Sequence, residues 1–179
     1  MTPFESRCLD AFPNWLRALG QDTRQLAAIA ENRELAPGAR RSATIAVNYL
    51  FKSLDLIPDG LEDLGFIDDA FVFRLAASSL APGDVQADTS GMLRRLAGEA
   101  ALVREFLGDV YPKLEAYVAG LEETTTRGRK VSDVLSNESV SADFAREARQ
   151  WADGYQPPAF LRDEKNLVKL RSFLAARLK

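Results

Sequence analysis

The sequence contains no histidine and only one cysteine, Cys8. Without histidine, neither a Ser-His-Asp triad nor a Cys-His pair can form, and no imidazole is available as a general base near neutral pH. One cysteine can form no internal disulfide and cannot supply the ligands of a structural zinc site. An enzyme built from this chain would therefore depend on carboxylates, Lys, Tyr, Ser or Thr, and we expect a reducing, cytoplasmic location.

Long apolar runs and a surplus of basic residues are also missing. The most apolar stretches, residues 43–51 and 70–81, are much shorter than the roughly 20 apolar residues that cross a bilayer. The net charge is -3, whereas nucleic-acid binding requires a clear basic surplus. Residues 1–12 show neither the basic segment nor the apolar core of a signal peptide. We therefore expect no transmembrane segment, no leader peptide and no nucleic-acid partner.

The residues that are present predict a compact helical protein. Hydrophobic residues make up 46% of the 179 residues, which suits a single globular domain over residues 1–179. Apolar residues recur at helical spacing in almost every segment, and no alternating run of strand length occurs. The pattern predicts an all-α fold, a helical bundle of about seven to nine helices.

Helix-breaking residues divide this pattern into segments. Thr2 and Pro3 are typical of a helix start, while Pro13 and Gly20 should kink or end that helix, with Asp22 or Thr23 capping a second one. Residues 124–130 combine Thr, Gly and basic residues without an apolar side chain, which predicts a linker or mobile loop. The helices of residues 132–179 would then form a small lobe or pack around the rest of the domain.

Residues 55–69, DLIPDGLEDLGFIDD, place six acidic side chains among apolar ones. They lie between two strongly apolar helices, so we predict a central helical hairpin joined by an acidic, proline-containing turn. Clustered carboxylates are typical ligands of Mg²⁺ or Ca²⁺. The candidate metal ligands are Asp55, Asp59, Asp68 and Asp69.

Known metal-binding patterns do not fit this spacing. In an EF-hand loop beginning at Asp55, the third and twelfth positions would be Ile57 and Phe66 instead of oxygen ligands. A D-D-x-x-D motif beginning at Asp68 would end on Val72. The alternative is structural: Asp55 would bond to the turn backbone, Asp68 would cap the next helix, and Asp69 would lie in its first turn.

The segment from Tyr49 to Phe73 resembles the YkvA-like family, a bacterial domain of unknown function. The positions that fall on the family pattern with matching spacing are Tyr49, Asp55, Leu56, Ile57, Pro58, Asp59, Gly65, Asp68 and Asp69. The resemblance covers residues 40–81 and implies a helical hairpin hinged on the acidic turn, with no established activity. Lys52-Ser53 replaces the Ser-Pro of the pattern, and residues 60–63 are more polar, which argues against membrane contact through this turn.

Three functions therefore follow as expectations. The leading one is a non-enzymatic interaction or scaffold protein with a protein partner, no cofactor and no identified catalytic residue. The second is a carboxylate-based, Mg²⁺- or Mn²⁺-dependent hydrolase at the acidic turn. The third is a peripheral lipid-surface binder, because residues 161–179 carry six basic and two acidic residues in an amphipathic helical pattern.

Overall fold

Helices account for nearly all of the regular structure. The computed structural model describes all 179 residues and, apart from one isolated bridge between Thr126 and Arg129, contains only helices. The α-helices are α1 (Pro3–Glu31), α2 (Pro37–Leu50), α3 (Ile67–Ser78), α4 (Pro82–Ala87), α5 (Met92–Leu107), α6 (Tyr111–Gly120), α7 (Val131–Ser136), α8 (Glu138–Gly154) and α9 (Glu164–Arg177). Two short 3-10 helices are η1 (Gly108–Val110) and η2 (Leu121–Glu123). The predicted all-α fold is confirmed.

The first helix is longer than the sequence pattern indicated. It runs from Pro3 to Glu31 without interruption, so the predicted division at Pro13 and Gly20, with a new cap at Asp22 or Thr23, is wrong. The Thr23 hydroxyl donates instead to the carbonyl one turn earlier, at 2.8 Å. Burial of the long apolar face of α1 outweighs the roughly 1 kcal/mol that a helical glycine costs.

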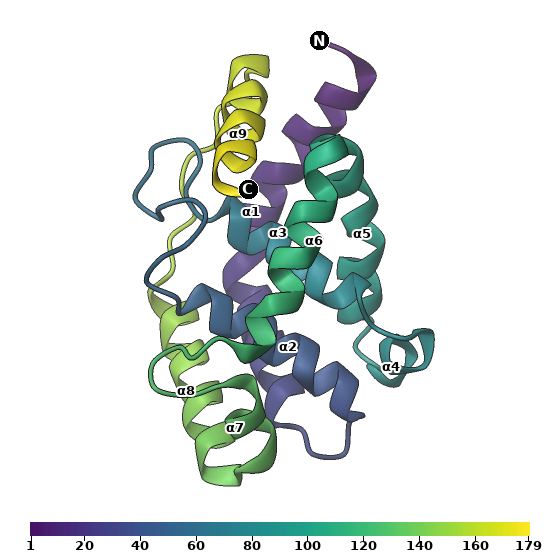
Figure 1. Cartoon of the computed structure of the whole chain (residues 1–179), viewed down its shortest axis with the longest axis vertical. Helices are drawn as coiled ribbons and strands as arrows, with labels where there is room; N and C mark the ends of the chain where they lie inside the picture. The colour runs from purple at the N-terminus through teal and green to yellow at the C-terminus, as the bar shows by residue number, and fades with distance from the viewer.

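The predicted central hairpin consists of α2 and α3. Figure 1 shows both helices in the middle of the molecule, where α2 lies against α1 and α7, and α3 lies against α5 and α6. Every residue from Ile67 to Ala77 of α3 is buried. A helix that is buried on all sides has no solvent face, which is why this segment is apolar at almost every position.

A single aromatic cluster connects the hairpin to both ends of the chain. The ring of Phe12 in α1 lies 5.1 Å from that of Phe71 in α3 and 5.1 Å from that of Phe106 in α5, measured between ring centroids. Phe160, in the extended segment before α9, lies 6.0 Å from Phe12 on another side. The N-terminal helix, the hairpin and the C-terminal segment therefore share one core.

Residues 124–130 form a hydrogen-bonded turn between η2 and α7. Thr126 and Arg129 exchange two backbone hydrogen bonds, of 2.9 and 3.2 Å. The Arg129 guanidinium forms an ion pair of 2.7 Å with Glu147 of α8. This predicted linker is therefore attached to α8 through a side-chain contact.

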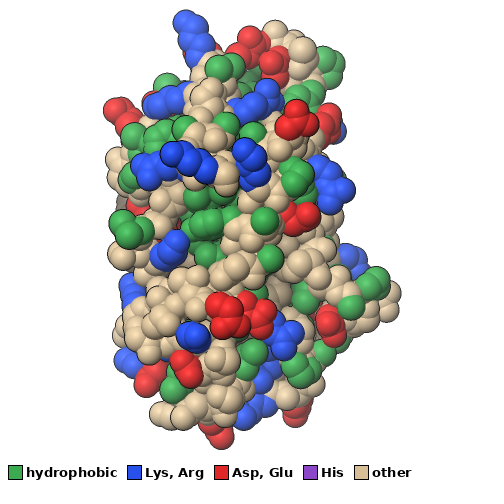
Figure 2. All heavy atoms as spheres, viewed as in Figure 1, with side chains coloured by type: hydrophobic (Ala, Val, Ile, Leu, Met, Phe, Trp, Pro, Cys, Tyr) green, Lys and Arg blue, Asp and Glu red, His purple; other side chains and the backbone are tan.

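The C-terminal helix uses its apolar face inside the protein. Asp163 caps α9, accepting the Lys165 backbone N–H at 2.9 Å. The buried residues of α9 include Leu167, Leu170 and Leu174, which leaves only scattered apolar side chains on its outer surface. Figure 2 shows Lys and Arg side chains over the part of the molecule where α9 lies. The lipid-surface function stays a prediction.

None of the helices combines the length and the apolar character that crossing a bilayer requires.

Candidate functional site

The acidic turn between α2 and α3 is closed by three hydrogen bonds. Tyr49, near the end of α2, donates its hydroxyl proton to Asp68 Oδ2 at 2.5 Å, and the tyrosine oxygen accepts the Leu56 backbone N–H at 2.9 Å. The same Asp68 oxygen accepts the Ile57 backbone N–H at 3.1 Å. This Tyr49–Asp68 clamp joins the end of one helix, the start of the next and the backbone between them.

The role of Asp68 differs from the predicted one. The N-cap of α3 is Phe66, in the left-handed conformation with φ 64, and it makes no side-chain cap. Asp68 and Asp69 both lie in the first helical turn, so the predicted N-cap role of Asp68 is wrong. Asp69 occupies the predicted first-turn position, where the helix dipole favours negative charge.

Gly65 allows two backbone segments of the turn to approach each other closely. A Cβ atom at this position would overlap the carbonyl oxygen of Asp59 and lie 3.0 Å from its carbonyl carbon. By contrast, a Cβ on Gly60 in the same turn would meet nothing within 4 Å. The backbone path therefore requires glycine at position 65, which gives this residue of the motif a structural role.

Burial controls the ionisation of the predicted carboxyl ligands. Asp69 is 0% exposed and neither of its carboxyl oxygens has a hydrogen-bond partner. Burial, followed by the nearby charges of Asp68, Asp55 and Asp59, raises the pKa of Asp69 well above its usual range. Burial also raises the pKa of Asp55 to about 8 and that of Asp68 to about 6. Burial thus favours the protonated form of Asp69, whereas an oxygen of Asp68 accepts two hydrogen bonds of the clamp.

The four predicted metal ligands differ in exposure. Asp59 is exposed, as is Pro58 before it; Asp55 is half-buried, and Asp68 and Asp69 lie in the interior. In this structure no group of three or more His, Cys, Asp or Glu side chains could hold a metal ion. The geometry thus offers no ready set of carboxylate ligands for Mg²⁺ or Ca²⁺, and the metal-dependent hydrolase stays a prediction.

A second buried charge on α3, Arg74, was not identified from the sequence. Its guanidinium lies 3.8 Å from the ring centroid of Trp15 and 2.7 Å from the carboxylate of Glu99, and it donates to the Ala70 carbonyl at 2.8 Å. Burial lowers the pKa of Arg74 to about 10. The group remains a compensated cation, and it stabilises the contact of α1, α3 and α5.

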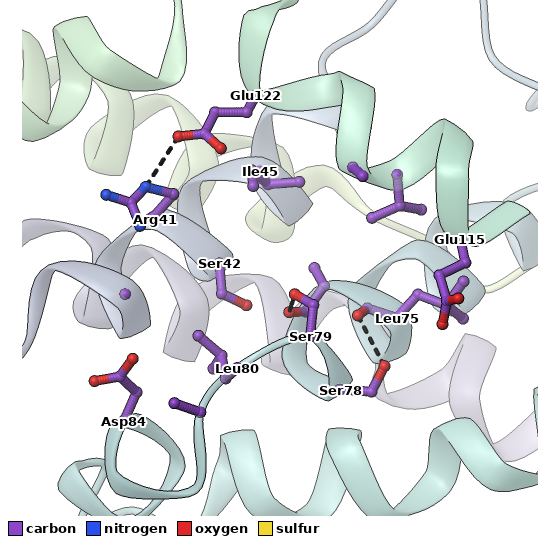
Figure 3. A pocket seen from close by; sticks show the side chains of 15 residues that line it. Arg41, Ser42, Ile45, Leu75, Ser78, Ser79, Leu80, Asp84, Glu115 and Glu122 are labelled. Carbon is purple, nitrogen blue, oxygen red and sulfur yellow. Dashed lines mark hydrogen bonds and ion pairs between the residues drawn. The ribbon is translucent and has the colours of Figure 1, made fainter.

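A cleft opens beside the hairpin, where α2, the C-terminal end of α3, α4 and α6 meet (Figure 3). Its volume of about 330 Å³ lies at the lower end of the roughly 300–1,000 Å³ of small-molecule sites. The apolar lining includes Ile45, Leu75, Leu80 and Val118, and the polar lining includes Ser42, Ser78, Ser79, Arg41, Asp84, Glu115 and Glu122. The lining therefore combines apolar side chains with polar groups that can orient a ligand.

Ser42 is the most unusual of these residues. It is 4% exposed, yet its hydroxyl has no hydrogen-bond partner within the protein, and Figure 3 shows it pointing from α2 into the cleft. The Ser78 and Ser79 hydroxyls differ, because they donate to carbonyl oxygens of their own helix at 2.9 and 2.8 Å. The Ser42 oxygen is not one of the fully buried polar atoms that lack a partner, so it is open to the solvent of the cleft and available to a ligand.

The charged residues of the cleft are partly paired. Arg41 forms an ion pair of 3.0 Å with Glu122, whereas Glu115 reaches Arg104 only at 4.0 Å, with both side chains exposed. The Asp84 carboxylate lies against Gly38 at the start of α2, where the helix dipole stabilises negative charge. Glu115 is therefore the least compensated carboxylate of the lining.

The cleft could not be found from the sequence. Its lining comes from positions spread between Gly38 and Glu122 on several helices, and no short spacing pattern connects them. Comparison of the chain with protein-family models, with curated proteins and with solved structures gave no significant match.

Proposed function

We propose that this chain is a non-enzymatic binding protein that receives its ligand in the cleft between α2, α3, α4 and α6. The observation that carries the proposal is Ser42, a residue that is only 4% exposed and whose hydroxyl points into the cleft without a hydrogen-bond partner in the protein. A ligand could bond to this hydroxyl without breaking a hydrogen bond within the protein.

The serines of the cleft support binding rather than nucleophilic catalysis. An activated serine requires a base within hydrogen-bond reach. The Ser78 and Ser79 hydroxyls donate to backbone carbonyls, and Ser42 contacts no base. The carboxylates of the lining lie at its rim, where they can orient a ligand.

The same proposal treats residues 40–81 as a YkvA-like hairpin whose acidic turn is a structural corner. The Tyr49–Asp68 clamp and the close approach at Gly65 support this assignment, because three positions of the motif have a structural function. Since α2 and α3 supply much of the cleft lining, the turn would set the geometry of the cleft.

Two exposed alanines of α6 provide a matched test. Ala119 lines the cleft, whereas Ala116 lies on the same helix outside it. Ala119→Trp should fill the mouth of the cleft, and Ala116→Trp should leave the cleft open. Ligand-observed NMR with three probes that share an apolar chain (hexylamine, hexanol and hexanoate) would measure binding.

We expect at least one probe to bind the wild-type and Ala116→Trp proteins and not Ala119→Trp. Circular dichroism would establish that both variants retain the wild-type helical content. The proposal is wrong if no probe binds, or if Ala119→Trp binds them as well as Ala116→Trp does.

A further inference from the structure

This inference rests on the proposed function and concerns the chemical class of the ligand. The charged residues that line the cleft are Asp84, Glu115, Glu122 and Arg41. Three carboxylates and one guanidinium give a formal charge of 1 − 3 = −2. Figure 2 shows acidic side chains gathered over the C-terminal end of α6, next to this region. The local charge therefore favours a cation and disfavours an anion.

Two helix ends add to this negative character. Leu75, Ala76 and Ser78 belong to the last turn of α3, and Val118 and Ala119 belong to the last turn of α6; all five line the cleft. The C-terminal end of a helix carries about half a negative elementary charge. The opposite end of α2 also reaches the cleft, but the Asp84 carboxylate lies against it at Gly38 and offsets its positive charge.

The polar groups that remain available suit an ammonium group. The Ser42 hydroxyl oxygen can accept a hydrogen bond, and Glu115 has only a distant partner, Arg104 at 4.0 Å. Glu122 is already occupied by Arg41 at 3.0 Å. An ammonium group supplies three donors and no acceptor, which matches acceptors that lack partners.

The apolar lining and the size of the cavity determine which kind of chain the ligand can carry. Ile45, Leu80 and Val118 face a cavity of about 330 Å³, which has room for a short aliphatic chain and not for a folded segment. We infer that the cleft binds a small primary alkylammonium compound, with its chain against these side chains and its ammonium group at the Glu115 carboxylate.

The three probes separate this inference from the proposed function. Hexylamine, hexanol and hexanoate have the same chain length and differ in the charge of the end group. Hexylamine should bind at least about fivefold more tightly than hexanol, because charge-assisted hydrogen bonds are roughly twice as strong as neutral ones. Hexanoate should bind most weakly, and added NaCl should weaken hexylamine binding.

Glu115→Gln tests the proposed contact directly, and Glu123→Gln is its control. Both residues are exposed glutamates, but Glu123 does not line the cleft. Isothermal titration with hexylamine should show about fivefold weaker binding to Glu115→Gln, from the loss of one charged hydrogen bond, and unchanged binding to Glu123→Gln.

A short acetylated and amidated peptide with one central lysine tests the alternative source of the same ammonium group. Free hexylamine should bind more tightly than this peptide, because the cavity admits a small molecule; tighter peptide binding would contradict the inference. Preferential binding of hexanol or hexanoate, blocked by Ala119→Trp, would also overturn the inference and leave the proposed function intact. If Glu115→Gln and Glu123→Gln bind hexylamine equally well, the assigned ammonium position is wrong.

Discussion

The acidic turn and the cleft both concentrate carboxyl groups, but they place them in opposite environments. Asp68 and Asp69 of the turn are buried, one in the Tyr49–Asp68 clamp and one without a partner. Glu115 and Glu122 of the cleft remain partly exposed. Burial makes the carboxyls of the turn part of the fold, whereas exposure leaves those of the cleft accessible to a ligand. Density of acidic residues in a sequence is thus a poor guide to which acids meet a ligand.

Among the substitutions that test this comparison, Gly65→Ala should lower the free energy of unfolding the most. The new Cβ would overlap the Asp59 carbonyl group, and relieving a backbone clash of this kind costs about 3 kcal/mol. Gly60→Ala, in the same turn, has open space around it and should change the free energy of unfolding by less than about 0.5 kcal/mol. Urea denaturation of both variants measures the difference. Equal stabilities would mean that the turn is not a rigid corner.

Tyr49→Phe should cause the next largest loss of stability. It removes the donor to Asp68 and the acceptor of the Leu56 N–H, and leaving buried polar groups unpaired costs about 2 kcal/mol. Tyr117→Phe is the matched control, because that ring is 6.2 Å away and its half-buried hydroxyl accepts from Lys52. Thermal denaturation should show a clearly lower midpoint for Tyr49→Phe. The clamp has no stabilising role if Tyr117→Phe is the more damaging substitution.

Ser42→Ala should change the stability of the protein the least. Its hydroxyl has no partner in the protein, and alanine is the better helix former, so stability should be unchanged or higher by up to about 0.5 kcal/mol. Thr44→Val, two residues along α2, removes a buried hydroxyl that donates to the Arg40 carbonyl at 2.7 Å, which should cost about 1 kcal/mol. A loss of stability in Ser42→Ala as large as that in Thr44→Val would show that Ser42 serves the fold.

The sequence predicted the elements of the turn better than those of the cleft. Helical spacing and the acidic, proline-containing segment were enough to predict the hairpin, because these are local patterns. The continuity of α1 through Pro13 and Gly20 was not predictable, since tertiary packing overrides local helix-breaking signals. Asp68 was misplaced because its partner, Tyr49, lies 19 residues away. The cleft depends entirely on such distant contacts.

The difference between the buried carboxyls of the turn and the exposed carboxyls of the cleft is tested most directly by the pH dependence of the melting temperature. The proteins to compare are wild type, Asp69→Asn and Glu115→Gln. A carboxyl whose pKa is raised by folding stabilises the protein below its unfolded pKa of about 3.9, and this contribution disappears as pH rises through the folded pKa. Because burial raises the pKa of Asp69 and brings that of Asp55 to about 8, the wild-type melting temperature should fall from pH 4 to pH 8.

Asp69→Asn should lose much of this pH dependence and melt above wild type at pH 8, while Glu115→Gln should follow the wild-type curve. The account is contradicted if Asp69→Asn follows the wild-type curve and Glu115→Gln flattens it.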